Sequence, residues 1–158
     1  MTRTEKMIDL LSRIVLNADE KATAAEELKA MLDGLDPEKH EDDLDREVER
    51  LLIEVGVPCH ITGYSNLKKA ITLAVNNPTL RHATTLLYGK AAEEAEYETT
   101  ASRVERSIRH AVELTWSRGD MDVLNKYFGN TVSPDKGKPT NAEFIATMTR
   151  EIRHRTAR

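Results

Sequence analysis

The chain has 158 residues with a formal net charge of −4, and only 4% of them are aromatic. Its single cysteine, Cys59, excludes an intramolecular disulfide framework and favours a reducing compartment. No apolar run approaches the roughly 20 residues of a membrane-spanning helix, and the N-terminus lacks the apolar segment of a signal peptide. We therefore expect a cytoplasmic protein without a membrane partner.

The first 35 residues predict a hairpin of two amphipathic helices, over 2–17 and 20–33. Thr2 and Glu5 have the spacing of a capping box, and Gly34 suits the end of the second helix. The apolar residues expected on one face of the first helix are Met7, Ile8, Leu11, Ile14 and Val15. Helices this short depend on packing, so the hairpin needs a partner: the rest of the chain, a second copy or another protein.

An acidic linker is predicted over residues 36–43, because this stretch contains Pro37 and almost no apolar residue. It would separate the hairpin, 1–35, from a domain over 44–158. The charges divide in the same way. Residues 1–55 hold 8 Lys and Arg against 16 Asp and Glu, whereas residues 56–158 hold 15 against 11. A basic C-terminal part that follows an acidic N-terminal part is typical of a chain that binds nucleic acid with one end.

Three further helical patterns precede the middle of the domain, over 44–54, 64–75 and 79 to about 88. Asn77 and Pro78 suit the N-cap and first residue of the third helix. Gly89 is predicted to interrupt the chain, so that a separate helix follows and ends near Tyr97. Cys59, in the turn between the first two helices, is expected to be a small buried residue.

The most informative stretch is a predicted helix over about 101–117. Ser102 and Glu105 have capping-box spacing, so the helix should begin near Ser102. A buried face is predicted for Val104, Ile108, Ala111, Val112 and Thr115, and the opposite face carries Ser102, Arg103, Arg106, Arg109, His110 and Glu113, with Glu105 beside them. Arginine can bind guanine O6 and N7 together, and glutamate can accept from cytosine N4.

A solvated helix with i,i+4 ion pairs would show the same periodicity. The helix and short turn before it favour a helix-turn-helix instead. Two more helices follow, over 121–128 and 141 to about 153, and Thr140 and Glu143 have capping-box spacing at the start of the last one. Lys136 and Lys138 precede it and could contact phosphate, although a solvated loop would look the same. The predicted fold class is an all-α helical bundle.

Catalytic and metal-binding patterns are absent from the sequence. The five histidines are scattered without a ligand spacing, and no glycine-rich loop is present to hold phosphate. We therefore expect neither an enzyme nor a bound metal or cofactor.

The run from Thr99 to Glu113, followed by Trp116-Ser-Arg-Gly-Asp, closely resembles the DNA-binding effector domain of the sporulation response regulators of endospore-forming bacteria, the stage-zero sporulation protein A family. Similar stretches lie at 53–64, 128–133 and 138–146. The resemblance covers about residues 44–153 in the family's order.

This resemblance implies a sequence-specific transcription regulator that places residues 101–117 in the major groove of a box like TGTCGAA, commonly in tandem. Double-stranded DNA is the implied partner, with RNA polymerase and a second copy on the neighbouring box as further candidates. The implied base contacts are Glu105, Arg106, Arg109 and His110, and the implied phosphate contacts are Ser102, Arg103, Lys138 and Thr140.

The family normally carries an N-terminal α/β receiver domain that is phosphorylated on an aspartate. Residues 1–40 show no strand pattern, so we do not expect control by phosphorylation of such a domain. An alternative function is that of an interaction module, or an antagonist that pairs with the full regulator or another partner through the N-terminal helices.

Overall fold

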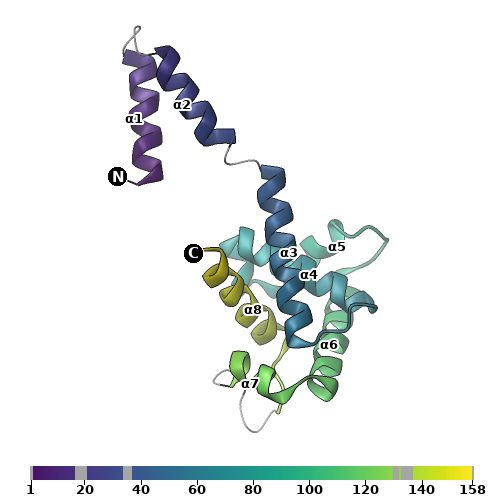
Figure 1. Cartoon of the computed structure of the whole chain (residues 1–158). Helices are drawn as coiled ribbons and strands as arrows, with labels where there is room; N and C mark the ends of the chain where they lie inside the picture. Colours follow the sequence, from purple (N-terminus) through teal and green to yellow (C-terminus); the bar gives the residue numbers. More distant parts are fainter. Residues whose placement is uncertain (1, 17–20, 34–36, 130–131, 133–136, 158) are drawn as a thin grey trace. The chain divides into compact units, whose positions relative to one another are not determined.

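The computed structural model describes residues 2–16, 21–33, 37–129, 132 and 137–157. Every secondary-structure element within them is a helix (Figure 1), which confirms the predicted all-α class. The elements are α1 (Arg3–Leu16), α2 (Lys21–Asp33), α3 (Pro37–Val55), α4 (Thr62–Asn76), the 3₁₀ helix η1 (Pro78–His82), α5 (Thr84–Glu93), α6 (Ala101–Arg118), α7 (Met121–Phe128) and α8 (Asn141–Thr156). The chain divides between Asp43 and Leu44 into two compact units, each described here by itself.

The N-terminal unit contains α1 packed against α2. Thr2 and Glu5 form the predicted capping box, since the Thr2 backbone N–H donates to Glu5 Oε2 (2.6 Å) and the Glu5 N–H donates to Thr2 Oγ1 (3.2 Å). Leu10 and Ala24 are fully buried between the helices. The predicted end of α2 at Gly34 lies outside the described residues.

The apolar face predicted for α1 is only partly correct. Leu10 is buried instead, whereas Ile8, Leu11 and Val15 expose 60%, 47% and 79% of their surface. The apolar arc of α1 is wider than one alanine-rich helix can cover, so α2 covers one edge of the arc and leaves the other edge open.

Residues 37–43, interpreted from the sequence as a linker, are helical and form the first turns of α3. A proline is tolerated in the first turn of a helix, where its missing N–H costs nothing. Acidic residues near a helix N-terminus are further stabilised by the helix dipole. The composition that suggested a linker is therefore also that of a helix start.

The second unit is organised around α4, which packs against α5, α6 and α8. Its core contains Leu67 and Ile71 of α4, Ile108 of α6, and Phe144 and Met148 of α8, all fully buried. The α4–α6 contact is close at Gly63, where an added Cβ would lie 2.2 Å from the Ser107 carbonyl oxygen. The absence of a side chain there fixes how near α6 lies to α4.

Aromatic contacts close the other end of this core. The Trp116 ring of α6 meets the edge of Phe128 at 5.0 Å between centroids, and Phe128 stacks on Phe144 at 5.1 Å. Such pairs add to the burial of apolar surface. They join α6, α7 and α8.

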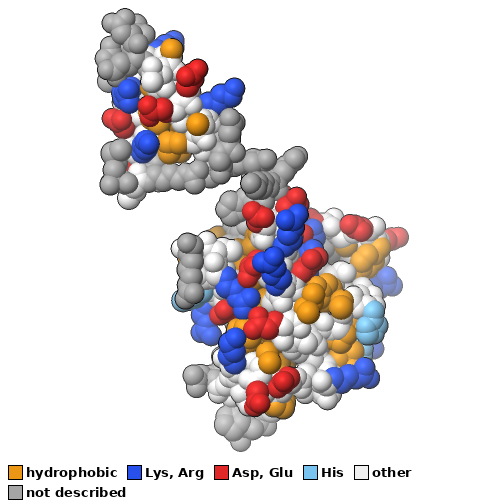
Figure 2. All heavy atoms as spheres, in the orientation of Figure 1, with side chains coloured by type: hydrophobic (Ala, Val, Ile, Leu, Met, Phe, Trp, Pro, Cys, Tyr) orange, Lys and Arg blue, Asp and Glu red, His pale blue; other side chains and the backbone are white. Residues whose placement is uncertain are grey.

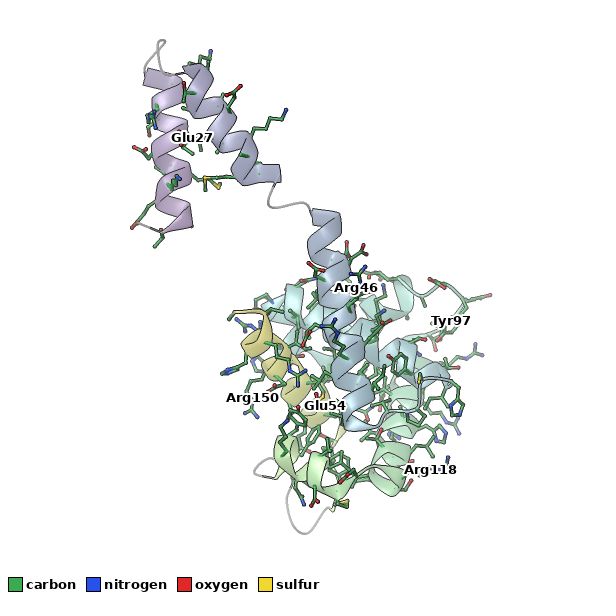
Figure 3. The ribbon with its side chains drawn as sticks, in the orientation of Figure 1. Glu27, Arg46, Glu54, Tyr97, Arg118 and Arg150 are labelled. Carbon is green, nitrogen blue, oxygen red and sulfur yellow. The ribbon has the colours of Figure 1, made fainter. Side chains whose placement is uncertain are left out.

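A polar network joins α3, α7 and α8 on the surface of this unit, where basic and acidic side chains are interspersed (Figure 2). The Arg155 guanidinium donates to Glu54 (3.0 Å), Glu47 (3.3 Å), Glu151 (3.0 Å) and the Tyr127 hydroxyl (2.8 Å). Tyr127 also donates to Glu54, near the end of α3 (Figure 3). The hydrogen bonds from Tyr127, Arg155 and Lys126 lower the pKa of Glu54 to about 2.

Some local predictions in this unit are wrong. Cys59 is exposed rather than buried, because it lies in the turn between α3 and α4. Gly89 does not interrupt the chain but lies inside α5, as single glycines in helices can. The predicted N-cap at Asn77 is confirmed, since its side chain accepts from the Thr79 N–H (3.2 Å).

Candidate nucleic-acid interface

The helix α6 begins at Ala101, and its N-cap is Thr100 rather than Ser102. The Thr100 backbone is extended, and its hydroxyl accepts from the Arg103 N–H at 3.3 Å. The predicted capping box of Ser102 and Glu105 is therefore wrong. Ser102 instead lies in the first turn with its side chain exposed, where its hydroxyl could reach a ligand.

The predicted buried face of α6 is confirmed, since Val104, Ile108, Ala111, Val112 and Thr115 are all buried. The opposite face is open to solvent. Its exposed members are Ser102, Arg103, Arg106, Arg109, His110 and Glu113, and Glu105 is half-buried. The eighteen-residue helix thus presents a long polar face.

Two side-chain hydrogen bonds hold α6 in place, and a third holds the connection before it. Asn66, a buried residue of α4, donates from Nδ2 to Ser107 Oγ (2.7 Å) and accepts at Oδ1 from the Tyr97 hydroxyl (3.0 Å). From the other side, Asn141 of α8 donates to the Glu105 carbonyl oxygen (3.1 Å). The helix α5 ends at Glu93 and not near Tyr97 as predicted, so Tyr97 lies in the connection before α6. These contacts fix both the helix and the turn that leads into it.

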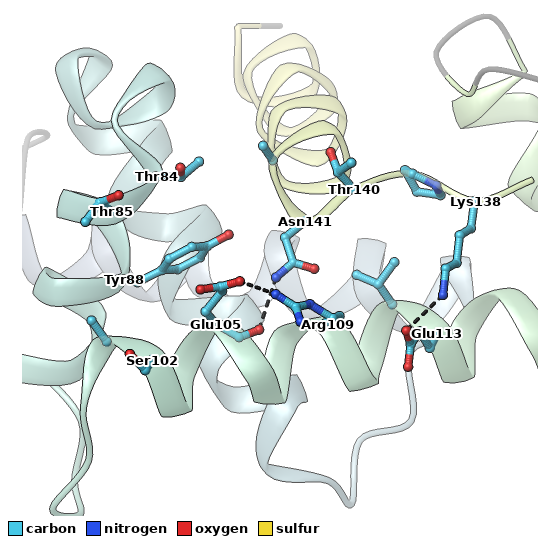
Figure 4. A pocket seen from close by; sticks show the side chains of 14 residues that line it. Thr84, Thr85, Tyr88, Ser102, Glu105, Arg109, Glu113, Lys138, Thr140 and Asn141 are labelled. Carbon is cyan, nitrogen blue, oxygen red and sulfur yellow. Dashed lines mark hydrogen bonds and ion pairs between the residues drawn. The ribbon is translucent and has the colours of Figure 1, made fainter. Parts of the chain in front are cut away.

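Two cations, one on α6 and one before the start of α8, are held by carboxylates of α6 (Figure 4). Arg109 pairs with Glu105 one turn earlier, and Lys138 Nζ lies 2.8 Å from Glu113 Oε1. The hydrogen bond from Lys138 lowers the pKa of Glu113. Arg103 and Arg106, by contrast, form no ion pair with any residue that the structure describes. The i,i+4 pair of a solvated helix is thus present, but it involves only one of the three arginines.

A cavity of about 630 Å³ lies between the N-terminal ends of three helices. Thr84 and Thr85 line it from α5, and Arg109 lines it from the middle of α6. The residues that the sequence had assigned to DNA and that also line this cavity are Ser102, Glu105, Arg109, Lys138 and Thr140. Helix N-termini favour anions, because their backbone N–H groups and dipole are positive. Two cations, Arg109 and Lys138, also line the cavity, and each is paired with a carboxylate that lines it as well, Glu105 or Glu113.

The family of the chain follows from a comparison of its sequence with known families. A family model described as "Sporulation initiation factor Spo0A C terminal" matches residues 48–152. The chain belongs to this family. The Spo0A C-terminal domain is the DNA-binding effector domain of a sporulation transcription regulator and not an enzyme. The matched residues include all of α4 to α7, the C-terminal part of α3 (48–55) and most of α8.

Within this Spo0A C-terminal domain, sequence reasoning missed several residues of the surface. Asn141, Glu113, Thr84 and Thr85 line the cavity but were not predicted as site residues. Asn141 directly follows the Thr140 N-cap, and the two threonines begin α5, so their positions at helix starts were the available signal. Lys136, a predicted phosphate candidate, lies outside the described residues. No described helix is long and apolar enough to cross a membrane.

Proposed function

We propose that residues 44–158 bind a TGTCGAA-like DNA box with α6 in the major groove. The observation that carries the proposal is the exposed polar face of α6, which has three arginines and is held rigidly by Asn66 and Asn141. A rigid helix with basic side chains near its N-terminus suits base reading. The family match supports the DNA-binding part of this proposal.

Base contacts are assigned to Glu105, Arg106, Arg109 and His110. Arg106 has no competing ion pair among the described residues, so its guanidinium is free for a guanine. Arg109 must exchange its pair with Glu105 when it binds a base. Phosphate contacts are assigned to Ser102, Arg103, Lys138 and Thr140, because Ser102 and Thr140 lie at helix starts and Lys138 lies beside one.

The proposal is tested by a fluorescence titration with a duplex carrying TGTCGAA and with a scrambled duplex, at two salt concentrations. The wild-type protein should bind the box about 10³-fold more tightly than the scrambled duplex. Arg109→Ala should cost about 1–3 kcal/mol of box binding and relax specificity at one position. Arg150→Ala is the matched control, because it removes the same charge from the exposed surface of α8 (Figure 3).

Equal affinity of wild type and Arg109→Ala for the box would contradict the base-reading assignment. Equal binding of the two duplexes by the wild type would contradict the proposed function as a whole. Binding to tandem boxes would add a second copy as a partner, and RNA polymerase is the partner expected of a regulator bound at a promoter. Such a regulator acts in the cytoplasm.

A second function is favoured by the open edge of α1. Ile8, Leu11 and Val15 form an exposed apolar strip that a partner helix could cover. The described residues before α3 form two helices, whereas a receiver domain requires strands. We therefore propose no phosphorylation control in this stretch, and the hairpin is instead a candidate site for protein binding. Loss of partner binding on removing residues 1–36, with box binding retained, would support this function.

A further inference from the structure

We propose that Glu113 restrains phosphate binding at the DNA interface by holding Lys138 in an intramolecular ion pair. This inference rests on the proposed function and concerns a residue to which no role is assigned above. It makes Glu113 an internal competitor of the DNA backbone for the Lys138 ammonium group.

The position of Lys138 explains why such a competitor matters. Lys138 precedes Pro139, which is buried, and Thr140, which is the N-cap of α8. The capping box there is complete, because the Thr140 N–H donates to Glu143 (2.7 Å) and the Glu143 N–H donates to Thr140 (3.2 Å). An ammonium group beside the positive end of a helix should attract a phosphate strongly.

The Lys138 side chain is nevertheless directed across to α6, where it meets Glu113 at 2.8 Å (Figure 4). The carboxylate thus neutralises the ammonium charge and directs the side chain toward α6, while accepting one of its three N–H donors. Glu113 opposes a phosphate in a second way as well, through direct repulsion of its negative charge.

The pair can be exchanged at low cost. The Lys138 and Glu113 side chains expose 48% and 46% of their surface, so water reaches both groups. Exposed ion pairs of this kind contribute little to stability. Arg109 and His110, one turn earlier on the same helix, lower the pKa of Glu113 as Lys138 does. The carboxylate therefore stays ionised. The restraint is therefore weak but present throughout the neutral pH range.

Glu113→Gln should strengthen binding to the TGTCGAA duplex and to the scrambled duplex by the same factor, about two- to five-fold. The factor should be equal because phosphates carry no sequence information. Glu41→Gln is the control, because Glu41 is an exposed carboxylate in the other compact unit.

A double-mutant cycle shows whether the effect passes through Lys138. In the Lys138→Met background, Glu113→Gln should gain less than about two-fold, because only direct repulsion remains. In DNA-free protein, NMR titration should show a higher Glu113 pKa in Lys138→Met than in wild type. Circular dichroism should show the same helix content for all variants, since both side chains are exposed.

Four results would overturn the inference. These are unchanged or weaker binding by Glu113→Gln, a gain confined to the TGTCGAA duplex, an equal gain for Glu41→Gln, and a gain undiminished in the Lys138→Met background. Failure of the wild type to distinguish the two duplexes would refute the proposed function instead. In that case, an equal gain in affinity of Glu113→Gln for both duplexes would still support the role of Glu113.

Discussion

Replacement of Gly63 by alanine tests the central contact between α4 and α6. The new Cβ would lie 2.2 Å from the Ser107 carbonyl oxygen and 2.8 Å from Ala111 Cβ, whereas ordinary contacts begin at 3.4 Å. The Ser107 oxygen belongs to the backbone, so it cannot move by a rotamer change. Relief of the clash requires α6 to move away from α4 by about 1 Å. We expect a loss of about 2–3 kcal/mol in the free energy of unfolding, at the upper end of overpacking effects.

Gly89→Ala is the matched control, because it makes the same chemical change inside another helix of the same unit. An added Cβ at Gly89 has no neighbour within 4 Å. Alanine is favoured over glycine in a helix interior by about 0.8–1 kcal/mol, so this variant should be more stable than wild type. The two substitutions should therefore change stability in opposite directions.

Thermal unfolding monitored by the single tryptophan, Trp116, separates these outcomes. Trp116 lies on α6 and packs on Phe128, so its fluorescence reports on the unit that contains both glycines. At about 4 °C per kcal/mol, Gly63→Ala should lower the Tm by about 8–12 °C and Gly89→Ala should raise it by about 3–4 °C. A Gly63→Ala variant as stable as wild type would refute the close packing of α6 on α4 described above.

Three further predictions concern other contacts. The pKa of Glu54 is about 2 in the folded protein and 4.5 without its partners, so its network stabilises the fold above pH 4.5 and loses that contribution as the pH falls toward 2. Glu54→Gln should therefore lower the free energy of unfolding at pH 7 by about 1 kcal/mol, given the partial exposure of the side chain. Urea titrations should show that the variant loses less stability than wild type between pH 4.5 and 2. The same pH profile for both proteins would contradict this. Asn66→Ala should lower the free energy of unfolding by about 1–3 kcal/mol, because it removes the buried partner of Ser107 and Tyr97. Tyr97→Phe should lower it by less than about 1 kcal/mol. Equal losses of the two variants in urea unfolding would argue against the hydrogen bonds of Asn66. Removal of residues 1–36 should leave the Trp116 melting curve and box binding unchanged, and a lower Tm would show that the second unit depends on the hairpin.

Local signals in the sequence were sufficient for many features of the fold. The capping box of Thr140 and Glu143 was predicted from spacing alone, and both of its hydrogen bonds are present. The buried face of α6 was likewise predicted from the helical repeat. Such features involve residues within a few positions of one another, where spacing and geometry are directly linked.

The same local signals failed where a sequence rule allowed two outcomes. Thr100 and Ser102 both suit an N-cap, and only the course of the preceding chain, anchored through Tyr97, places the cap at Thr100. Gly89 suits a break as well as a helix interior. The α1 face was misjudged at Leu10 for a similar reason, because the position of α2 decides which edge of the apolar arc is covered.

The candidate site also depends on contacts that no local pattern reveals. Asn66 and Ser107 are 41 positions apart, and Lys138 and Glu113 are 25 apart. Periodicity predicted that Glu113 would be exposed, but it carried no information that Lys138 would lie beside it. The convergence of three helix starts on one cavity likewise arises only in the folded chain.

The network around Arg155 bears on how this domain should be produced as a fragment. The matched family residues, 48–152, end before Arg155 and begin after Glu47. A fragment trimmed to those limits would keep the Glu54 carboxylate but lose the guanidinium that joins α3 to α7 and α8. It would also lose the buried Leu44. The compact unit, Leu44–Arg158, is thus longer at both ends than the stretch by which its family is recognised.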